Sequence, residues 1–140
     1  MLKSTRFGDV ELSDEAVVEF PSGLIGLRGH RYALLPHGRD GVFVWLHSMD
    51  DPDLALPITR PWGFFPQYEV ELSDSEAERI GVTDPAQADV YVTVRAAEEA
   101  ADFSANLRAP IIISGGRGYQ VINEAADAPV RAPLFPQPVG

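Results

Sequence analysis

Three aspartates in one short segment have the residue type and spacing of a possible cation site. Asp50, Asp51 and Asp53 surround Pro52 between two apolar runs, and clustered carboxylate oxygens are ligands that calcium prefers. A calcium-binding loop would also carry further alternating oxygen ligands, a glycine and a later glutamate, and the segment lacks that pattern. Aspartate side chains cap backbone N–H groups, and proline fixes one φ angle. These residues therefore favour a tight turn, and we expect no bound metal.

The histidines and serines show no pattern that is typical of catalysis. His30, His37 and His47 share no motif with one another or with a carboxylate at ligand spacing. His47 precedes Ser48, but neighbouring residues of a strand point to opposite faces, and no Gly-x-Ser-x-Gly elbow occurs. The glycines of residues 21–29 lack the spacing of a dinucleotide or P-loop site. The chain has no cysteine, which excludes a thiol nucleophile, and we expect neither an enzyme nor a bound cofactor.

Short strands must position these residues. The apolar run from Val42 to Leu46 is long enough for a buried strand and too short for a helix, and Leu54 to Thr59 resumes extended structure after the acidic turn. Val90 to Val94 is the clearest strand, apolar enough on both faces to be central in a sheet. Ile111–Ile113 and Tyr119–Ile122 flank a glycine-rich turn and predict a hairpin.

Further short elements alternate with turn signals along the rest of the chain. They are a hairpin over Leu2–Leu12 turning at Gly8-Asp9, strands at Ala16–Phe20, Tyr32–Leu35 (ended by Pro36) and Tyr68–Leu72, and a capped helix at Asp74–Ile80. Turn signals about every ten residues are typical of a barrel. We predict a mainly β, small single-domain protein, either β-barrel-like or a folded antiparallel sheet, with one or two short helices. Residues 1–125 would form the domain and residues 126–140 a proline-rich extended tail.

Three large aromatic rings lie close together between two prolines, in the segment Arg60–Pro66. Trp62, Phe64 and Phe65 could form a satellite core or an exposed platform for a protein partner. Burial is favoured because aromatic side chains lie mostly inside proteins, and the platform remains open as the alternative.

The distribution of charge limits the kinds of partner. The net charge is −10, and between Glu69 and Asp102 ten acidic residues stand against two arginines. Such a face repels nucleic-acid phosphates and anionic membranes and attracts a basic partner, although acidity also simply keeps a domain soluble. The N-terminal residues turn polar at once, and no segment approaches the length of a membrane span. We therefore expect a cytoplasmic protein that binds neither nucleic acid directly nor a membrane.

Several blocks of residues occur in the order and at the spacing of a known family. They are Phe20-Pro21-x-Gly23-x-x-Gly26, Trp45-Leu46-x-Ser48-x-Asp50-Asp51-Pro52-Asp53-Leu54-Ala55, Phe64-Phe65-Pro66-x-Tyr68-Glu69, Asn106-Leu107-x-Ala109-Pro110-Ile111, Gln120-Val121-Ile122 and Pro129-Val130-Arg131. Together they span Phe20 to Arg131. In these blocks the chain resembles the flagellar assembly factor FliW family.

The resemblance implies a small, non-enzymatic β-barrel-like domain that binds two proteins in turn. One is flagellin, which the protein would hold as a chaperone until export; the other is CsrA, a basic RNA-binding protein that represses flagellin translation, so that its capture antagonises repression. Candidate residues for partner contact are Asp50, Asp51, Asp53, Phe64, Phe65 and Asn106. The alternative is a small-ligand-binding barrel or an uncharacterised enzyme, which the absence of any deep pocket with convergent polar groups would remove.

Overall fold

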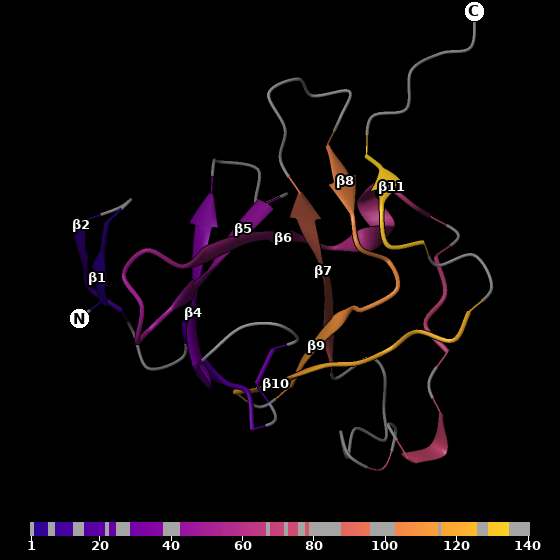
Figure 1. Cartoon of the computed structure of the whole chain (residues 1–140), viewed down its shortest axis with the longest axis horizontal. Coiled ribbons are helices and arrows are strands. Elements are labelled where there is room, and N and C mark those ends of the chain that lie inside the picture. The colour runs from indigo at the N-terminus through magenta and orange to yellow at the C-terminus, as the bar shows by residue number, and fades with distance from the viewer. Residues whose placement is uncertain are drawn as a thin grey trace, which may run out of the picture.

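Seven of the described strands close into a barrel. The computed structural model describes residues 2–5, 8–12, 16–21, 23–24, 29–37, 43–66, 68–71, 73–75, 78, 88–95, 103–114, 116–125 and 129–134. The strands of the barrel are β3 (Val17–Glu19), β4 (Arg31–His37), β5 (Phe43–Ser48), β6 (Ala55–Thr59), β7 (Asp89–Arg95), β9 (Ile111–Ser114) and β10 (Arg117–Gln120). Their order around the barrel is β7, β6, β5, β4, β3, β10 and β9, and β9 pairs again with β7 (Figure 1). The predicted mainly β, barrel-like fold is confirmed.

Smaller elements extend the barrel on two sides. β8 (Ser104–Ala105) pairs with the end of β7, and β11 (Ala132–Pro133) pairs with β8. β1 (Leu2–Ser4) and β2 (Gly8–Val10) form a separate hairpin, drawn in indigo in Figure 1. A short 3-10 helix, η2 (Pro61–Gly63), follows β6. The predicted helix over Asp74–Ile80 is described only at residues 74, 75 and 78, which have helical backbone.

Among the described residues, apolar side chains form three clusters, one inside the barrel and two on its outer surface. The inner cluster contains Val18, Phe20, Leu24, Tyr32, Leu46, Ile58, Tyr91, Ile111 and Ile113. The second cluster lies over β7 and β8 and contains Tyr68, Val92, Val94, Ala105, Leu107, Ala125, Ala132 and Leu134. The third joins the β1–β2 hairpin to β4 and contains Leu2, Ala33 and Leu35.

Both faces of strand β5 are covered by apolar clusters, which explains its continuous apolar run from Phe43 to Leu46. Val44 and Leu46 pack in the inner cluster, whereas Phe43 packs against the second cluster and Trp45 against the third. Successive residues of a strand point to opposite faces, so both faces of β5 are covered and alternation with polar residues is not required. β7 pairs with β6, β8 and β9, which confirms the prediction of a central strand.

The predicted strand at Tyr68–Leu72 is wrong in its described residues, 68–71, which are in no strand. Their alternation of burial is as expected, because Tyr68 is buried while Glu69 and Glu71 are exposed. One side chain takes the place of a neighbouring strand: Asn123 Nδ2 donates to the carbonyl of Glu69 (2.8 Å), and the N–H of Glu71 donates to Asn123 Oδ1 (2.8 Å). Alternation therefore identified the buried face and not the hydrogen-bonding partner.

Two predicted boundaries are wrong by a few residues. The Gly8-Asp9 pair lies inside β2, where Gly8 is opposite Ser4 in the register, and the turn comes before it. Pro36 lies within β4 and does not end it. Proline is tolerated there because β3 pairs with β4 only from Arg31 to Ala33, so that Pro36 has a described neighbouring strand on one side alone.

Residues 129–134 pack against the second cluster. The N–H of Leu107 donates to the carbonyl of Pro129 (3.0 Å), and the N–H of Leu134 donates to the carbonyl of Phe103 (3.0 Å). Ala132 and Leu134 are buried. The division into a domain of residues 1–125 and an extended tail of residues 126–140 stays a prediction.

Candidate functional site

The acidic turn, residues 50–53, joins β5 to β6 and is closed by side-chain caps. Ser48 Oγ accepts hydrogen bonds from the N–H groups of Asp50 (3.1 Å) and Asp51 (3.0 Å). Asp51 Oδ1 accepts one from the N–H of Asp53 (2.9 Å), and the N–H of Leu54 donates to the carbonyl of Asp51 (3.2 Å). The turn geometry is as expected, although Ser48 supplies two of the caps that we expected from aspartate.

Contacts with β1 and its following turn tie the N-terminal hairpin to this region. Thr5 Oγ1 donates a hydrogen bond to Asp53 Oδ1. His47 is fully buried; its Nδ1 lies 2.7 Å from the carbonyl oxygen of Ser48, to which it donates, and its Nε2 lies 2.8 Å from Ser4 Oγ. Both ring nitrogens of His47 are therefore engaged in joining elements of the fold.

The acidic turn also acts on a tyrosine of the inner cluster. Burial raises the pKa of the Tyr32 hydroxyl above 10.0, and the charges of Asp50 and Asp51 raise it further. The hydroxyl is therefore neutral at physiological pH. The raised pKa means that the folded state favours the neutral Tyr32 hydroxyl more than the unfolded state does. The stability that the neutral hydroxyl contributes is therefore complete below pH 10.0 and is lost as the pH rises through the raised pKa.

The aromatic loop, residues 60–66, divides its rings between the interior and the surface. Phe64 and Phe65 are half-buried and pack against the second cluster, and the ring centroids of Phe64 and Phe43 lie 5.8 Å apart. Trp62 is 44% exposed, and its Nε1 donates to the carbonyl of Tyr68 (2.9 Å). The phenylalanines thus support the local packing, and Trp62 presents most of the exposed aromatic surface of the loop.

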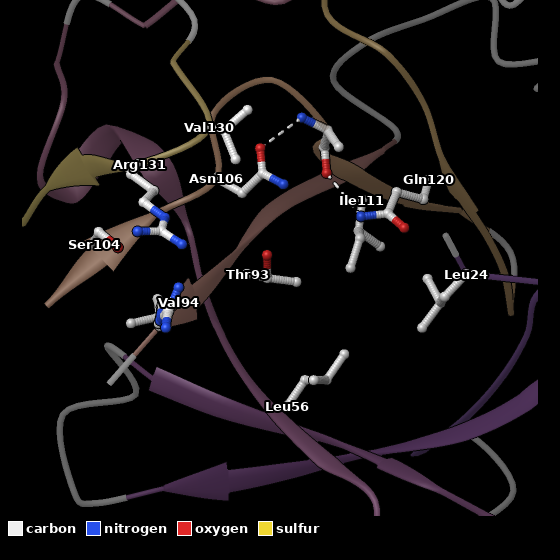
Figure 2. Close-up of a pocket in the computed structure, with 12 residues that line it drawn as sticks. Leu24, Leu56, Thr93, Val94, Ser104, Asn106, Ile111, Gln120, Val130 and Arg131 are labelled. Atoms are coloured by element: carbon white, nitrogen blue, oxygen red, sulfur yellow. Dashed lines mark hydrogen bonds between the residues drawn. The ribbon is translucent and has the colours of Figure 1, made fainter. Parts of the chain in front are cut away.

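Asn106 lies on the wall of a pocket at one end of the barrel (Figure 2). Its Oδ1 accepts hydrogen bonds from the N–H groups of Arg108 (3.0 Å) and Ala109 (3.1 Å). Its own N–H donates to the carbonyl of Thr93 (3.0 Å). These bonds fix a turn after β8 and leave the Nδ2 group directed into the pocket (Figure 2).

The structure does not bring the six candidate residues together. The acidic turn precedes β6 and the aromatic loop follows it, and β6 has five residues, a length of about 17 Å at the usual rise per residue. Asn106 occupies a third position, after β8. A partner that touched all six residues would have to reach the acidic turn, the aromatic loop and the turn after β8 at the same time.

Sequence reasoning missed two features of the structure. The side chain of Asn123 is fully buried and forms hydrogen bonds with two other segments, residues 68–71 and Leu107. Arg95 and Arg131 line the pocket. The sequence signal for Asn123 was its position midway between the apolar residues Val121 and Ala125, because alternate residues of an extended segment share one face. No comparable signal in the sequence brings the two arginines together, because they are far apart along the chain.

In the part of the chain that the structure describes, no three His, Asp or Glu side chains gather closely enough to hold a metal ion. Among the same residues, no helix has both the length and the apolar character needed to cross a membrane. Thr93, Asn106 and Gln120 do converge, on the pocket of Figure 2.

Comparisons with known proteins all point to one family. Residues 1–134 match the family model described as "FliW protein". The chain is 30% identical over 139 residues to "Flagellar assembly factor FliW" of Desulfitobacterium hafniense (strain DSM 10664 / DCB-2), covering 97% of this chain and 91% of that protein. It is 41% identical over 132 residues to the protein of the same name from Azoarcus sp. (strain BH72), covering 87% of this chain and 90% of the relative.

A solved structure agrees with the sequence comparisons. A crystal structure of the flagellar assembly factor FliW aligns with this chain at a TM-score of 0.87 and 30% sequence identity. The alignment covers 99% of both chains, so the likeness includes the barrel and the elements that extend it.

Proposed function

This chain belongs to the FliW family of flagellar assembly factors, and we propose that it is a non-enzymatic, cytoplasmic protein that binds flagellin and CsrA in turn. While flagellin is present, flagellin occupies the protein. After flagellin is exported, the free protein captures CsrA and relieves the repression of flagellin translation. The observation that carries the proposal is the likeness to FliW proteins along nearly the whole chain, in sequence and in structure.

Surface charge supports a basic partner such as CsrA. The exposed carboxylates of Asp50, Asp51 and Asp53 stand together on one turn, in a chain of net charge −10. Complementary charge speeds the association of two proteins and suppresses wrong partners. Salt screens such charges over about 10 Å at 0.1 M ionic strength, so we expect the affinity for CsrA to fall as salt is added.

A triple variant tests the contribution of the acidic turn while preserving its hydrogen bonds. Asp51→Asn and Asp53→Asn each keep a side-chain oxygen, which the N–H of Asp53 and the hydroxyl of Thr5 require. Asp50→Lys reverses the charge of a side chain whose carboxylate accepts no hydrogen bond among the described residues. Exposed ion pairs contribute about 0.2–1 kcal/mol each, so calorimetry is expected to show roughly tenfold weaker CsrA binding.

The matched control is Glu124→Lys, which reverses the charge of an exposed side chain outside the turn. It is expected to change the affinity for CsrA by less than about twofold. Circular dichroism establishes that each variant is folded. A folded triple variant that binds CsrA as tightly as the wild-type protein would show that the acidic turn is not part of the CsrA contact.

A further inference from the structure

The function proposed above assigns no ligand to the pocket at one end of the barrel. Its volume is about 490 Å³, within the roughly 300–1,000 Å³ that is usual for small-ligand sites. Residues of β6, β7, β8, β9 and β10, together with the segment before β11, line it. The mouths of β-barrels are frequent ligand sites, because strands from all sides converge there.

The floor of the pocket is apolar. Leu24, Leu56 and Ile111 line it and pack in the inner cluster, and Figure 2 shows Leu24 and Leu56 across the pocket from Asn106. Leu56 is half-buried, whereas Ile58, two residues further along the same face of β6, is fully buried. The barrel is therefore filled at Ile58 and open at Leu56. An apolar group placed there would remove leucine surface from water, which favours binding.

Two polar side chains that line the pocket, Asn106 and Gln120, are held in place by hydrogen bonds to the backbone. Asn106 Oδ1 accepts two backbone hydrogen bonds (3.0 and 3.1 Å), while its Nδ2 donates none among the described residues. Gln120 Nε2 donates to the carbonyl of Ala109 (3.1 Å), as Figure 2 shows. Groups whose rotamers are fixed in advance lose little conformational entropy when they bind a ligand.

Two arginines give this end of the barrel a local positive charge. Arg95 ends β7 opposite Ser104 in the register, and the guanidinium of Arg131 lies towards Ser104 and Asn106 in Figure 2. Neither arginine forms an ion pair within the described part of the chain. The ion pair found there joins Arg60 and Asp89. The chain has 21 acidic residues and 11 basic ones, so two cations at one pocket with no ion-pair partner among the described residues favour an anion as the ligand.

We propose that this pocket binds a small amphipathic carboxylate. The apolar tail lies over Leu56 and Ile111, and the carboxylate accepts hydrogen bonds from Arg131 and from Nδ2 of Asn106. A guanidinium presents a fork of donors that matches the two oxygens of a carboxylate, and Arg95 adds a second positive charge. The inference stands independently of the binding of flagellin or CsrA.

Nuclear magnetic resonance titration with octanoate and with 1-octanol tests the proposal, because the two probes share a tail and differ in charge. We expect octanoate to shift the amide signals of Thr93 and Asn106 and to bind at least about tenfold more tightly than 1-octanol. Arg131→Gln is expected to weaken octanoate binding about tenfold and to leave the 1-octanol affinity unchanged. Arg117→Gln is the control, since Arg117 is exposed on β10 and does not line the pocket.

Equal affinity for the two probes overturns the proposal, as does full octanoate affinity in the Arg131→Gln variant. Shifts confined to amides away from the pocket also overturn it. If a peptide with an apolar, acidic end binds at the pocket and octanoate does not, the ligand of the pocket is a protein segment. That outcome would equally reject a small carboxylate as the ligand.

Discussion

Replacement of Asn123 by leucine is expected to lower the free energy of unfolding by about 3–5 kcal/mol. The side chain is fully buried. Its Oδ1 accepts hydrogen bonds from the N–H groups of Glu71 (2.8 Å) and Ala125 (3.0 Å), and its Nδ2 donates to the carbonyl of Glu69 (2.8 Å). A buried backbone group that loses its partner costs about 1–3 kcal/mol. Leucine fills a similar space and leaves all three groups without that partner.

Urea unfolding followed by circular dichroism measures this loss. The control is Ile122→Ser, because Ile122 is the neighbouring residue and is 48% exposed; it is expected to change stability by less than about 1 kcal/mol. Asn123→Asp keeps an oxygen acceptor but loses the Nδ2 donor, and it should also be destabilised. An Asn123→Leu protein within about 1 kcal/mol of the wild type would contradict the structural role of this amide.

Gly118→Ala is expected to destabilise the protein by about 2–3 kcal/mol through overpacking of the barrel interior. A Cβ at this position would lie 2.5 Å from Cε2 and 2.6 Å from Cζ of Phe20. Phe20 is fully buried, and its ring meets Tyr32 edge to face with centroids 5.5 Å apart. Movement of the ring away from the new Cβ would disturb this contact with Tyr32, and close-packed interiors resist such shifts.

A double-mutant cycle separates this steric conflict from other effects of alanine. Phe20→Leu in the Gly118→Ala background removes the ring, so the two substitutions together are expected to cost at least about 1 kcal/mol less than the sum of the single variants. Gly63→Ala is the matched control, since its Cβ would meet no atom within 4 Å. Stability of Gly118→Ala equal to that of Gly63→Ala would refute the close approach to Phe20.

Much of the barrel could be predicted because its strands are short, apolar and separated by turn residues. The described part of the Val42–Leu46 run, Phe43 to Leu46, lies in β5, and the Val90–Val94 run lies in β7. The glycine-rich segment between the isoleucines and Tyr119 joins β9 to β10 as the predicted hairpin. In these segments local preference and tertiary packing favour the same structure, so a local signal suffices.

The strand pair that closes the barrel and the course of residues 68–71 could not be predicted, since both depend on contacts distant in sequence. β9 meets β7 through the pairing of Ile111 with Tyr91, and nothing in either strand specifies that partner. Tyr68 to Glu71 alternates like a strand, but the hydrogen bonds come from the side chain of Asn123. Periodicity reports which face is buried, and it does not report which group completes the backbone hydrogen bonds.

The candidate site residues illustrate the same limit. The turn chemistry of Asp51 follows from local sequence, and the structure places its carboxylate on the N–H of Asp53. Convergence of Arg95, Asn106 and Arg131 on one pocket arises only when β7, β8 and the segment before β11 come together. Their roles in binding a partner or a ligand remain predictions.

The exchange of partners is tested most directly by calorimetric titration of CsrA into the purified protein, first alone and then saturated with flagellin. We expect CsrA to bind the free protein with a dissociation constant well below about 100 μM, and to give no heat of binding when flagellin occupies the protein. Association of neither CsrA nor flagellin below about 100 μM would contradict the proposed function. Undiminished binding of CsrA to the flagellin-saturated protein would contradict the exchange.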